Sequence, residues 1–154
     1  MSPNIISFDP KYAKDFHDLN IEWLETYFYV EPYDKEVLSK PDLYIINKGG
    51  HIFFILENNK VVATVALMPT DDTSVLELTK MAVTPKARGK KLGQNLLQYC
   101  IDFARSNNYS ALMLYSNTIL ENAIHLYRKY GFEELQLEKD NPYERANIKM
   151  LLKL

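Results

Sequence analysis

The chain has 154 residues, 47% hydrophobic and 25% charged, which is the composition of a globular domain that can fold without disulfides or metals. A net charge of −2 gives no reason to expect a nucleic-acid partner, and no apolar run approaches the roughly 20 residues that span a membrane. The lone Cys100, the three scattered histidines and the lack of a secretory signal exclude a disulfide scaffold, argue against a metal site and favour a cytoplasmic protein.

The first part of the chain predicts a strand followed by helices. No linker or repeat divides the sequence, so we expect one domain over residues 1–154. Residues 4–8 favour a short strand, and an Asp-Pro pair after them is a natural helix start. Aromatic and apolar residues then recur every three or four positions up to Tyr27, which is the period of a helix with one buried face. A second, shorter helix is expected over residues 34–39, before a proline.

The middle of the chain predicts three neighbouring strands. Residues 51–57 and 60–68 are rich in Ile, Phe and Val, and Asn58-Asn59 between them can adopt the positive φ angles of a hairpin turn. A polar, Asp-rich turn leads to a third strand at residues 75–83. Because three strands follow one another without a crossover helix, we expect the centre of the sheet to be antiparallel.

Helices and strands alternate in the rest of the chain. Apolar helical stripes over residues 92–104 and 120–127 flank a short strand at 111–115, and residues 146–154 alternate between apolar and polar as a final strand does. The predicted order is β-α-α-β-β-β-α-β-α-β-β, a mixed α/β fold with a centrally antiparallel sheet flanked by helices. We expect strands 75–83 and 111–115, with the helix between them, to form one right-handed parallel unit.

Two of the five glycines, Gly89 and Gly93, lie between a predicted strand and an amphipathic helix. Such a junction exposes unpaired N–H groups and the positive end of a helix dipole, which together favour an anion such as phosphate. The alternative is a solvated helix start with incidental glycines, because short glycine patterns are weak signals. Five cations and no acid occupy the surrounding segment, namely Lys80, Lys86, Arg88, Lys90 and Lys91.

Two segments resemble motifs of the GCN5-related N-acetyltransferase (GNAT) family. Residues 83–93 resemble its acetyl-CoA-binding segment, usually written Arg/Gln-x-x-Gly-x-Gly/Ala, and residues 123–132 resemble its later helix with a Tyr-x-x-x-Gly-Phe ending. The resemblance implies acetyl transfer from acetyl-CoA to an amine by direct attack, with no metal and no covalent enzyme intermediate. The cofactor-binding residues that it implies are Met81, Ala82, Val83, Arg88, Gly89, Lys90, Lys91, Leu92 and Gly93, with Met81 and Val83 acting through their backbone.

The chain departs from the family's pattern at two positions. The central glycine of the loop is Lys91 here, so we expect cofactor binding to survive if this residue keeps a negative φ. The asparagine often found three residues before the helical alanine is Leu120 here. Asn117, which we prefer, or Asn122 could make that polar contact to the cofactor instead.

Acetyl transfer to an amine needs a base for the amine's proton and an acid for the departing thiolate. Glu77 lies six residues before Val83, the offset of the catalytic Glu in the histone-acetylating branch of the family. Strand alternation would place Glu77 on the same face as Met81 and Val83, where burial would raise the pKa of its carboxyl. The alternative is a Glu at the rim of the sheet or paired with a lysine. The resemblance implies that Tyr127 is the general acid, the alternative being a core tyrosine.

The acceptor site is expected at the N-terminal helices and the last loop. Residues 1–42 hold nine acids against four lysines, an excess that either attracts a cationic amine or marks a solvated helix face. Candidate substrate contacts are Glu25, Tyr27 and Tyr143, the alternative for the aromatic residues being a place in the core. The expected partner is a small-molecule or peptide amine, with no nucleic acid and no membrane, and the last strand could pair across a homodimer if it lies at an edge of the sheet.

Two other classes of function remain open from the sequence. One is an acyl-CoA-binding regulatory module that has lost transfer, which predicts cofactor binding without turnover. The other is a protein-interaction domain that keeps only the fold, which predicts no CoA binding at all.

Overall fold

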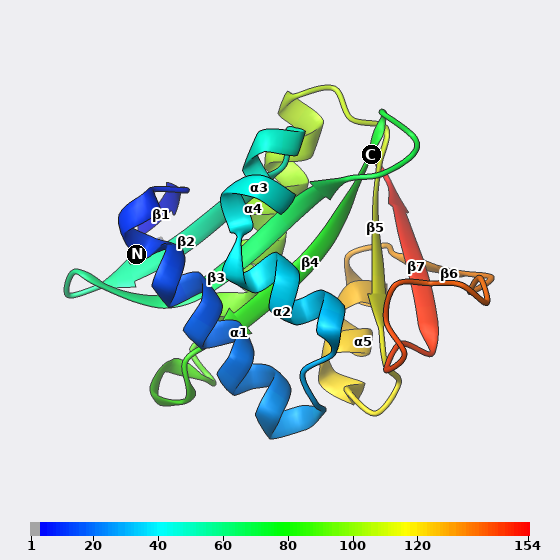
Figure 1. Ribbon diagram of the computed structural model, residues 1–154. Coiled ribbons are helices and arrows are strands. Elements are labelled where there is room, and N and C mark those ends of the chain that lie inside the picture. The colour runs from blue at the N-terminus through cyan, green and yellow to red at the C-terminus, as the bar shows by residue number, and fades with distance from the viewer. Residues whose placement is uncertain (1–3) are drawn as a thin grey trace.

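The computed structural model describes residues 4–154 and has a seven-stranded mixed sheet at its centre, with helices on both faces (Figure 1). The strands lie in the order β1-β2-β3-β4-β5-β7-β6, and only β4 and β5 are parallel neighbours. The predicted order of elements and the antiparallel centre are therefore confirmed. The strands are β1 (Asn4–Ser7), β2 (His51–Glu57), β3 (Lys60–Pro69), β4 (Val75–Val83), β5 (Ala111–Ser116), β6 (Glu133–Leu135) and β7 (Ile148–Lys153).

The helices form two layers, each over its own apolar core. α1 and α2 cover one face, where Phe16 and Leu38 pack on Phe54 of β2. α4 and α5 cover the other face, where Leu96 and Ile124 belong to the larger core cluster. The helices are α1 (Ala13–Tyr27), α2 (Pro32–Ser39), the short α3 (Pro41–Tyr44), which the sequence did not predict, α4 (Leu92–Ser106) and α5 (Glu121–Lys129).

A bulge in β4 reverses the direction of its side chains halfway along the strand. Thr64 of β3 pairs with Ala82 and Ala66 pairs with Thr79, so the single residue between them on β3 faces two residues on β4. One of these two is Lys80, whose φ of 56° is left-handed.

The bulge overturns the prediction that Glu77 shares a face with Met81 and Val83. After the bulge, Met81 and Val83 pack against the core under α4. Glu77 and Lys80 both lie near the Tyr143 hydroxyl, on the opposite face of the sheet. Strict alternation fails here because one extra residue shifts the parity of every residue after it.

β4 and β5 are joined only at their first residues. Their ladder pairs Val75–Glu77 with Ala111–Met113 and then stops. Figure 1 shows the two strands diverging beyond this point, between α1 on one side and α5 on the other. The last residues of β4 therefore have no partner on β5, which opens the sheet at its centre.

The last strand does not lie at an edge of the sheet. β7 runs between β5 and β6, with Leu152 opposite Leu112 of β5 and Met150 opposite Glu134 of β6. The condition for pairing across a homodimer through this strand is therefore not met. Over residues 4–154, no helix has both the length and the apolar character needed to span a membrane.

Candidate active site

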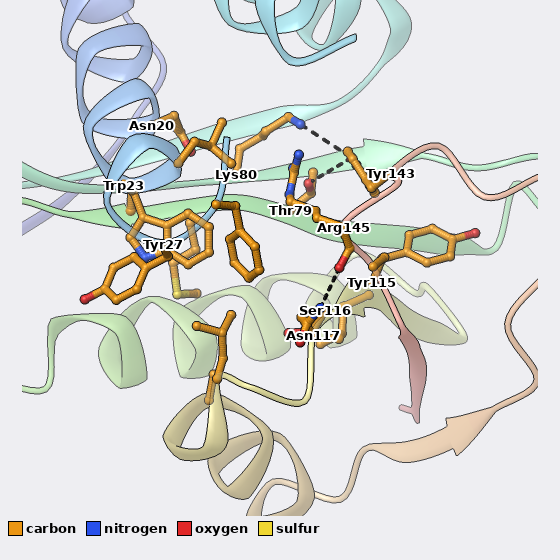
Figure 2. A pocket seen from close by; sticks show the side chains of 18 of the residues that line it. Asn20, Trp23, Tyr27, Thr79, Lys80, Tyr115, Ser116, Asn117, Tyr143 and Arg145 are labelled. Atoms are coloured by element: carbon orange, nitrogen blue, oxygen red, sulfur yellow. Dashed lines mark hydrogen bonds between the residues drawn. The ribbon is translucent and has the colours of Figure 1, made fainter. Parts of the chain in front are cut away.

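Where β4 and β5 diverge, the structure leaves a cavity of about 410 Å³ (Figure 2). α1 and α5 bound it on two sides, and the segment before β7 (residues 136–147) contributes Tyr143, Arg145 and Ala146 to its wall. On the α1 side Trp23 and Tyr27 form an aromatic wall, with ring centroids 5.2 Å apart. A mostly apolar cavity with a few polar groups is the usual form of a small-molecule site. The polar side chains that line it include Thr79, Lys80, Tyr127, Tyr143 and Arg145.

A second cavity, of about 650 Å³, lies beside the loop between β4 and α4. Val83 and Arg88 line both cavities, so the two adjoin at the end of β4. The first N–H groups of α4 have no partner within the helix, and Lys91 and Lys129 add positive charge beside them. This combination fits the phosphates of a nucleotide-like ligand.

The loop keeps a glycine-like backbone at both critical positions. Gly89 has a φ of +88°, and an added Cβ there would meet no atom within 4 Å. Lys91 has a φ of 62° and is the N-cap of α4, so the condition set above, a negative φ at this residue, is not met. The left-handed backbone costs a residue other than glycine about 1–2 kcal/mol.

The cations of this segment do not form one phosphate-binding cluster. The guanidinium of Arg88 donates to both carboxylate oxygens of Glu22 on α1, at 2.8 and 2.9 Å, and its Nε donates to the carbonyl of Val83. Lys90 lies 3.4 Å from a carboxylate oxygen of Glu57. Lys80 points to the opposite face of the sheet because of the bulge.

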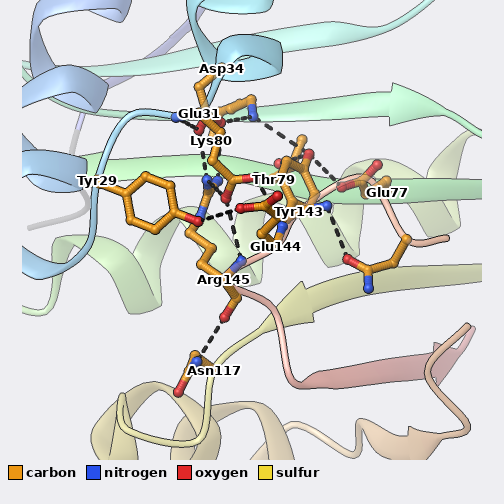
Figure 3. Close-up of polar contacts among 11 residues, drawn as sticks. Tyr29, Glu31, Asp34, Glu77, Thr79, Lys80, Asn117, Tyr143, Glu144 and Arg145 are labelled. Carbon is orange, nitrogen blue, oxygen red and sulfur yellow. Dashed lines mark hydrogen bonds and ion pairs between the residues drawn. The ribbon is translucent and has the colours of Figure 1, made fainter. Parts of the chain in front are cut away.

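A buried network of ion pairs joins α2, β4 and the segment before β7 (Figure 3). Asp34 is fully buried and accepts hydrogen bonds from Nζ of Lys80 at 3.1 Å and from Nη1 of Arg145 at 2.6 Å. Glu31, also buried, accepts from Nη1 of Arg145 at 2.8 Å and from the backbone N–H of Glu144 at 2.9 Å. Two acids thus neutralise two bases beside the cavity.

The pKa values in this network follow from burial and from the partners. Burial alone would raise the pKa of Asp34, but the hydrogen bond from Arg145 and the charge of Lys80 hold it below its ordinary value. Burial lowers the pKa of Lys80, and Asp34 opposes that effect. In the sequence, Lys80 and Glu77 are the two charged residues of this strand, and the run of cations after Lys80 predicts a place in the phosphate-binding segment instead.

Glu77 does not line either cavity. Its Oε2 accepts a hydrogen bond from the hydroxyl of Tyr143 at 3.1 Å, and Tyr143 in turn lines the first cavity. Burial raises the pKa of the Glu77 carboxyl, while the charge of Lys80 and the bond from Tyr143 act against this rise. The expected direction of the shift therefore holds, although the neighbours are not the predicted ones.

Tyr127 lines the first cavity from α5, with its ring centroid 5.7 Å from that of Phe132. Within residues 4–154 its hydroxyl has no hydrogen-bond partner, and burial raises its pKa to about 12. Asn117 lines the same cavity but donates to the carbonyl of Arg145 at 2.7 Å and accepts from the N–H of Ile119. Asn122 lies in the second cavity.

The acids of the N-terminal segment do not gather at the cavity. Glu25 is exposed on α1 and lines neither cavity, whereas Tyr27 and Tyr143 both line the first one. Most of the remaining acids have cationic partners, which removes the basis for a general attraction of cationic amines. The paired acids are Asp18 with Lys14, Glu22 with Arg88, Glu36 with Lys40, and Glu31 and Asp34 with Arg145.

Comparison with known sequences identifies one family. A family model described as the acetyltransferase (GNAT) family matches residues 16–132. The probable N-acetyltransferase camello of Xenopus tropicalis is 30% identical over 105 residues, which are 68% of this chain and 48% of that protein. The chain spans about half or less of the length of the first curated relatives that it matches.

Solved structures share the fold over nearly the whole chain. An acetyltransferase of the GNAT family from Staphylococcus aureus Mu50 superposes with a TM-score of 0.85 at 22% identity, covering 97% of this chain and 98% of that one. A phosphinothricin acetyltransferase from Sinorhizobium meliloti, solved in complex with AcCoA, has a TM-score of 0.79 at 17% identity, covering 100% of this chain and 89% of that one. At these identities the likeness shows the fold.

The buried network predicts a large effect for Asp34→Asn. Removing one partner of a buried ion pair costs about 3–5 kcal/mol, because Lys80 would remain charged without its carboxylate and Arg145 would keep only Glu31. Urea unfolding of the variant and of the native chain measures the loss. The matched control is Asp18→Asn, whose pair with Lys14 lies on the exposed surface of α1 and should contribute far less. Equal losses in the two variants would contradict the role of the network.

Glu77→Gln predicts a pH-dependent change in stability. A carboxyl whose pKa is raised on folding stabilises the protein fully below its unfolded pKa, and this contribution is lost as the pH rises through the folded pKa. The variant lacks this titration, so its melting temperature relative to the native chain should rise as the pH increases above the ordinary value of 4.5. Thermal melts between about pH 4 and pH 8 test this, and a difference that does not vary with pH would contradict it.

Proposed function

The chain belongs to the acetyltransferase (GNAT) family, and we propose that it transfers the acetyl group of acetyl-CoA to a primary amine of a small molecule or peptide. The observation that carries the proposal is the opening formed by the two adjoining cavities, one at the start of α4 and one in the gap between β4 and β5. One end of this opening offers backbone N–H groups and cations, and the other offers a mostly apolar cavity with ionisable groups.

The residues at the first end fit the phosphates of acetyl-CoA. Gly89, Lys91 and Gly93 line the second cavity at the start of α4, where unpaired N–H groups and the helix dipole attract negative charge. A Cβ on Gly89 would meet no protein atom and would point into open space. Arg88 is engaged with Glu22 and contributes to the shape of the loop, through its bond to the carbonyl of Val83.

The gap between the strands fits the extended arm of the cofactor. Beyond Glu77, β4 has no ladder with β5, so backbone groups of Met81, Ala82 and Val83 face the opening. A backbone N–H there can stabilise the negative charge that develops on an acyl oxygen during transfer. Another member of the fold, the Sinorhizobium meliloti enzyme, was solved with AcCoA, which supports this use of the opening.

Tyr127 is placed to act as the general acid. When bound, acetyl-CoA supplies an acetyl thioester whose sulfur leaves as a thiolate. The pKa of about 12 keeps the Tyr127 hydroxyl protonated at neutral pH, and its position in the cavity makes the proton available there. The same apolar surroundings would raise the pKa of the CoA thiol, which favours transfer of the proton from Tyr127 to the sulfur.

The lining of the first cavity, between β4 and β5, limits the choice of acceptor. Among the described residues, it contains no aspartate or glutamate, while Lys80, Arg88 and Arg145 all contribute to it. A polyamine would bring several positive charges to this lining with no carboxylate to receive them. We therefore propose an acceptor with a single amine on a partly apolar body, which the aromatic wall of Trp23 and Tyr27 can contact.

Acetyl-CoA should stabilise the native chain against heat. A ligand at about 100 times its dissociation constant adds about 2.7 kcal/mol, which raises the melting midpoint by roughly 5–10 °C for a chain of this size. Gly89→Glu should abolish this shift, because a carboxylate would stand beside the phosphates. The matched control is Gly49→Glu, because Gly49 has a similar φ of +90° and equally open space around an added Cβ, but lines neither cavity. A shift that survives in Gly89→Glu would place the cofactor elsewhere, and no shift in the native chain would favour the interaction-domain alternative.

Tyr127→Phe should preserve the acetyl-CoA shift and slow turnover, by about 10²-fold or more, because only the proton donor is lost. Release of free CoA, followed across a panel of primary amines, measures turnover whichever amine is the acceptor. Tyr130→Phe is the control, since Tyr130 packs against the same core but lines neither cavity. Unchanged turnover in Tyr127→Phe would return this residue to a purely structural role. Cofactor binding without CoA release for any amine would favour the regulatory module.

A further inference from the structure

We propose that Tyr143 carries the proton of the acceptor amine from the cavity to Glu77, so that Glu77 acts as the base without touching the substrate. This inference rests on the proposed acetyl transfer. It follows from the placement of the two groups, because Glu77 lines neither cavity, whereas Tyr143, whose hydroxyl is bonded to Glu77 (Figure 3), lines the first one.

The Tyr143 hydroxyl has the contacts that a relay requires. It donates to Oε2 of Glu77 at 3.1 Å, and Oγ1 of Thr79 lies 3.2 Å away, where it can donate to one lone pair of the phenol oxygen. Nζ of Lys80 lies 3.5 Å from the same oxygen, at the limit of a hydrogen bond. The lone pair of the phenol oxygen that faces Lys80 is therefore only weakly engaged. Because Tyr143 lines the first cavity, the acceptor amine can donate its N–H to this lone pair in place of Lys80.

The ring of Tyr143 is held in position from several sides. Nζ of Lys80 lies 4.7 Å from the ring centroid, and the guanidinium carbon of Arg145 lies 4.8 Å from it. The rings of Tyr33 and Tyr115 lie 5.9 Å away on α2 and β5. Only 4% of Tyr143 is exposed to solvent, so its hydroxyl has little freedom to leave Glu77.

The proton transfer balances without another reactant. As the amine nitrogen bonds to the acyl carbon, its N–H proton passes to the phenol oxygen of Tyr143, and the phenol's own proton passes to Oε2 of Glu77. Tyr143 begins and ends neutral, and Glu77 changes from carboxylate to carboxylic acid. Glu77 is half-buried, so it can return the proton to solvent before the next cycle.

The acid–base properties of the two groups agree with this order. Burial and the charge of Glu77 raise the pKa of Tyr143 well above its ordinary value, so Tyr143 cannot serve as a free phenolate base and must give up its proton as it gains one. The raised pKa of Glu77 makes it a better proton acceptor than an exposed carboxylate. The titratable groups around Glu77 are Lys80 of β4, Tyr33 of α2, Tyr115 of β5, and Glu138 and Tyr143 of the segment before β7.

The test compares Tyr143→Phe, Glu77→Gln and the double variant, measured as CoA release at saturating acetyl-CoA and amine. If the two groups act in series, each single variant should lose about 10²-fold in kcat and the double variant should lose no more than either. Independent roles would multiply the two losses. Tyr29→Phe is the matched control, because its hydroxyl also anchors the segment before β7, through Glu144 at 2.8 Å, and it should keep native turnover.

The pH profile separates a relay from a structural role. In the native chain kcat should fall as the pH drops through the pKa of Glu77, and both single variants should lose this dependence. Each variant's acetyl-CoA melting shift shows whether it is folded, and if Tyr143→Phe does not fold, Glu77→Gln decides alone. A native rate and pH profile in either single variant would overturn the relay while leaving acetyl transfer intact. No CoA release from the native chain with any amine would overturn both.

Discussion

Asp34 joins three parts of the chain that lie far apart in the sequence. Its carboxylate receives Lys80 from β4 and Arg145 from the segment before β7, while its own backbone belongs to the first turn of α2. These partners stand 46 and 111 positions away in the sequence. Burying the Asp34 carboxylate without cationic partners would destabilise the fold. The packing of α2 on the sheet and the position of the segment before β7 therefore depend on each other.

The bulge in β4 is what makes this arrangement available. In a regular strand, Lys80 would lie on the α4 face with Leu76 and Leu78, where no acid of the network could reach it. The extra residue turns Lys80 toward Asp34 and brings it to the same side as Glu77 and Thr79. The same irregularity turns Met81 and Val83 toward the core under α4, and Val83 lines the second cavity together with Gly89. One local departure from alternation thus serves both ends of the opening.

The sequence was sufficient for the elements and their order because these depend on short-range patterns. Apolar period and turn residues located the strands and helices, and the loop with Gly89 and Gly93, which the family resemblance singled out, lines the second cavity. The left-handed backbone of Lys91 was missed, because a lysine carries no local signal for a positive φ. The partners of Lys80 were missed for a different reason. They depend on contacts between segments that the sequence places far apart, and the bulge that exposes Lys80 to them has no residue signature.

The two halves of the opening differ in how much the family fixes them. The family model covers residues 16–132, which include the loop, α4 and Tyr127, but it ends before Tyr143 and Arg145. The half that fits acetyl-CoA uses mainly backbone groups, which tolerate changes of side chain such as Lys91 in place of glycine. The acceptor half uses side chains that are held by the Asp34 network and by the contact of Tyr143 with Glu77. The acceptor half therefore combines α1, β4 and β5, which lie within the matched residues, with Tyr143 and Arg145, which lie beyond them and depend on the Asp34 network for their position.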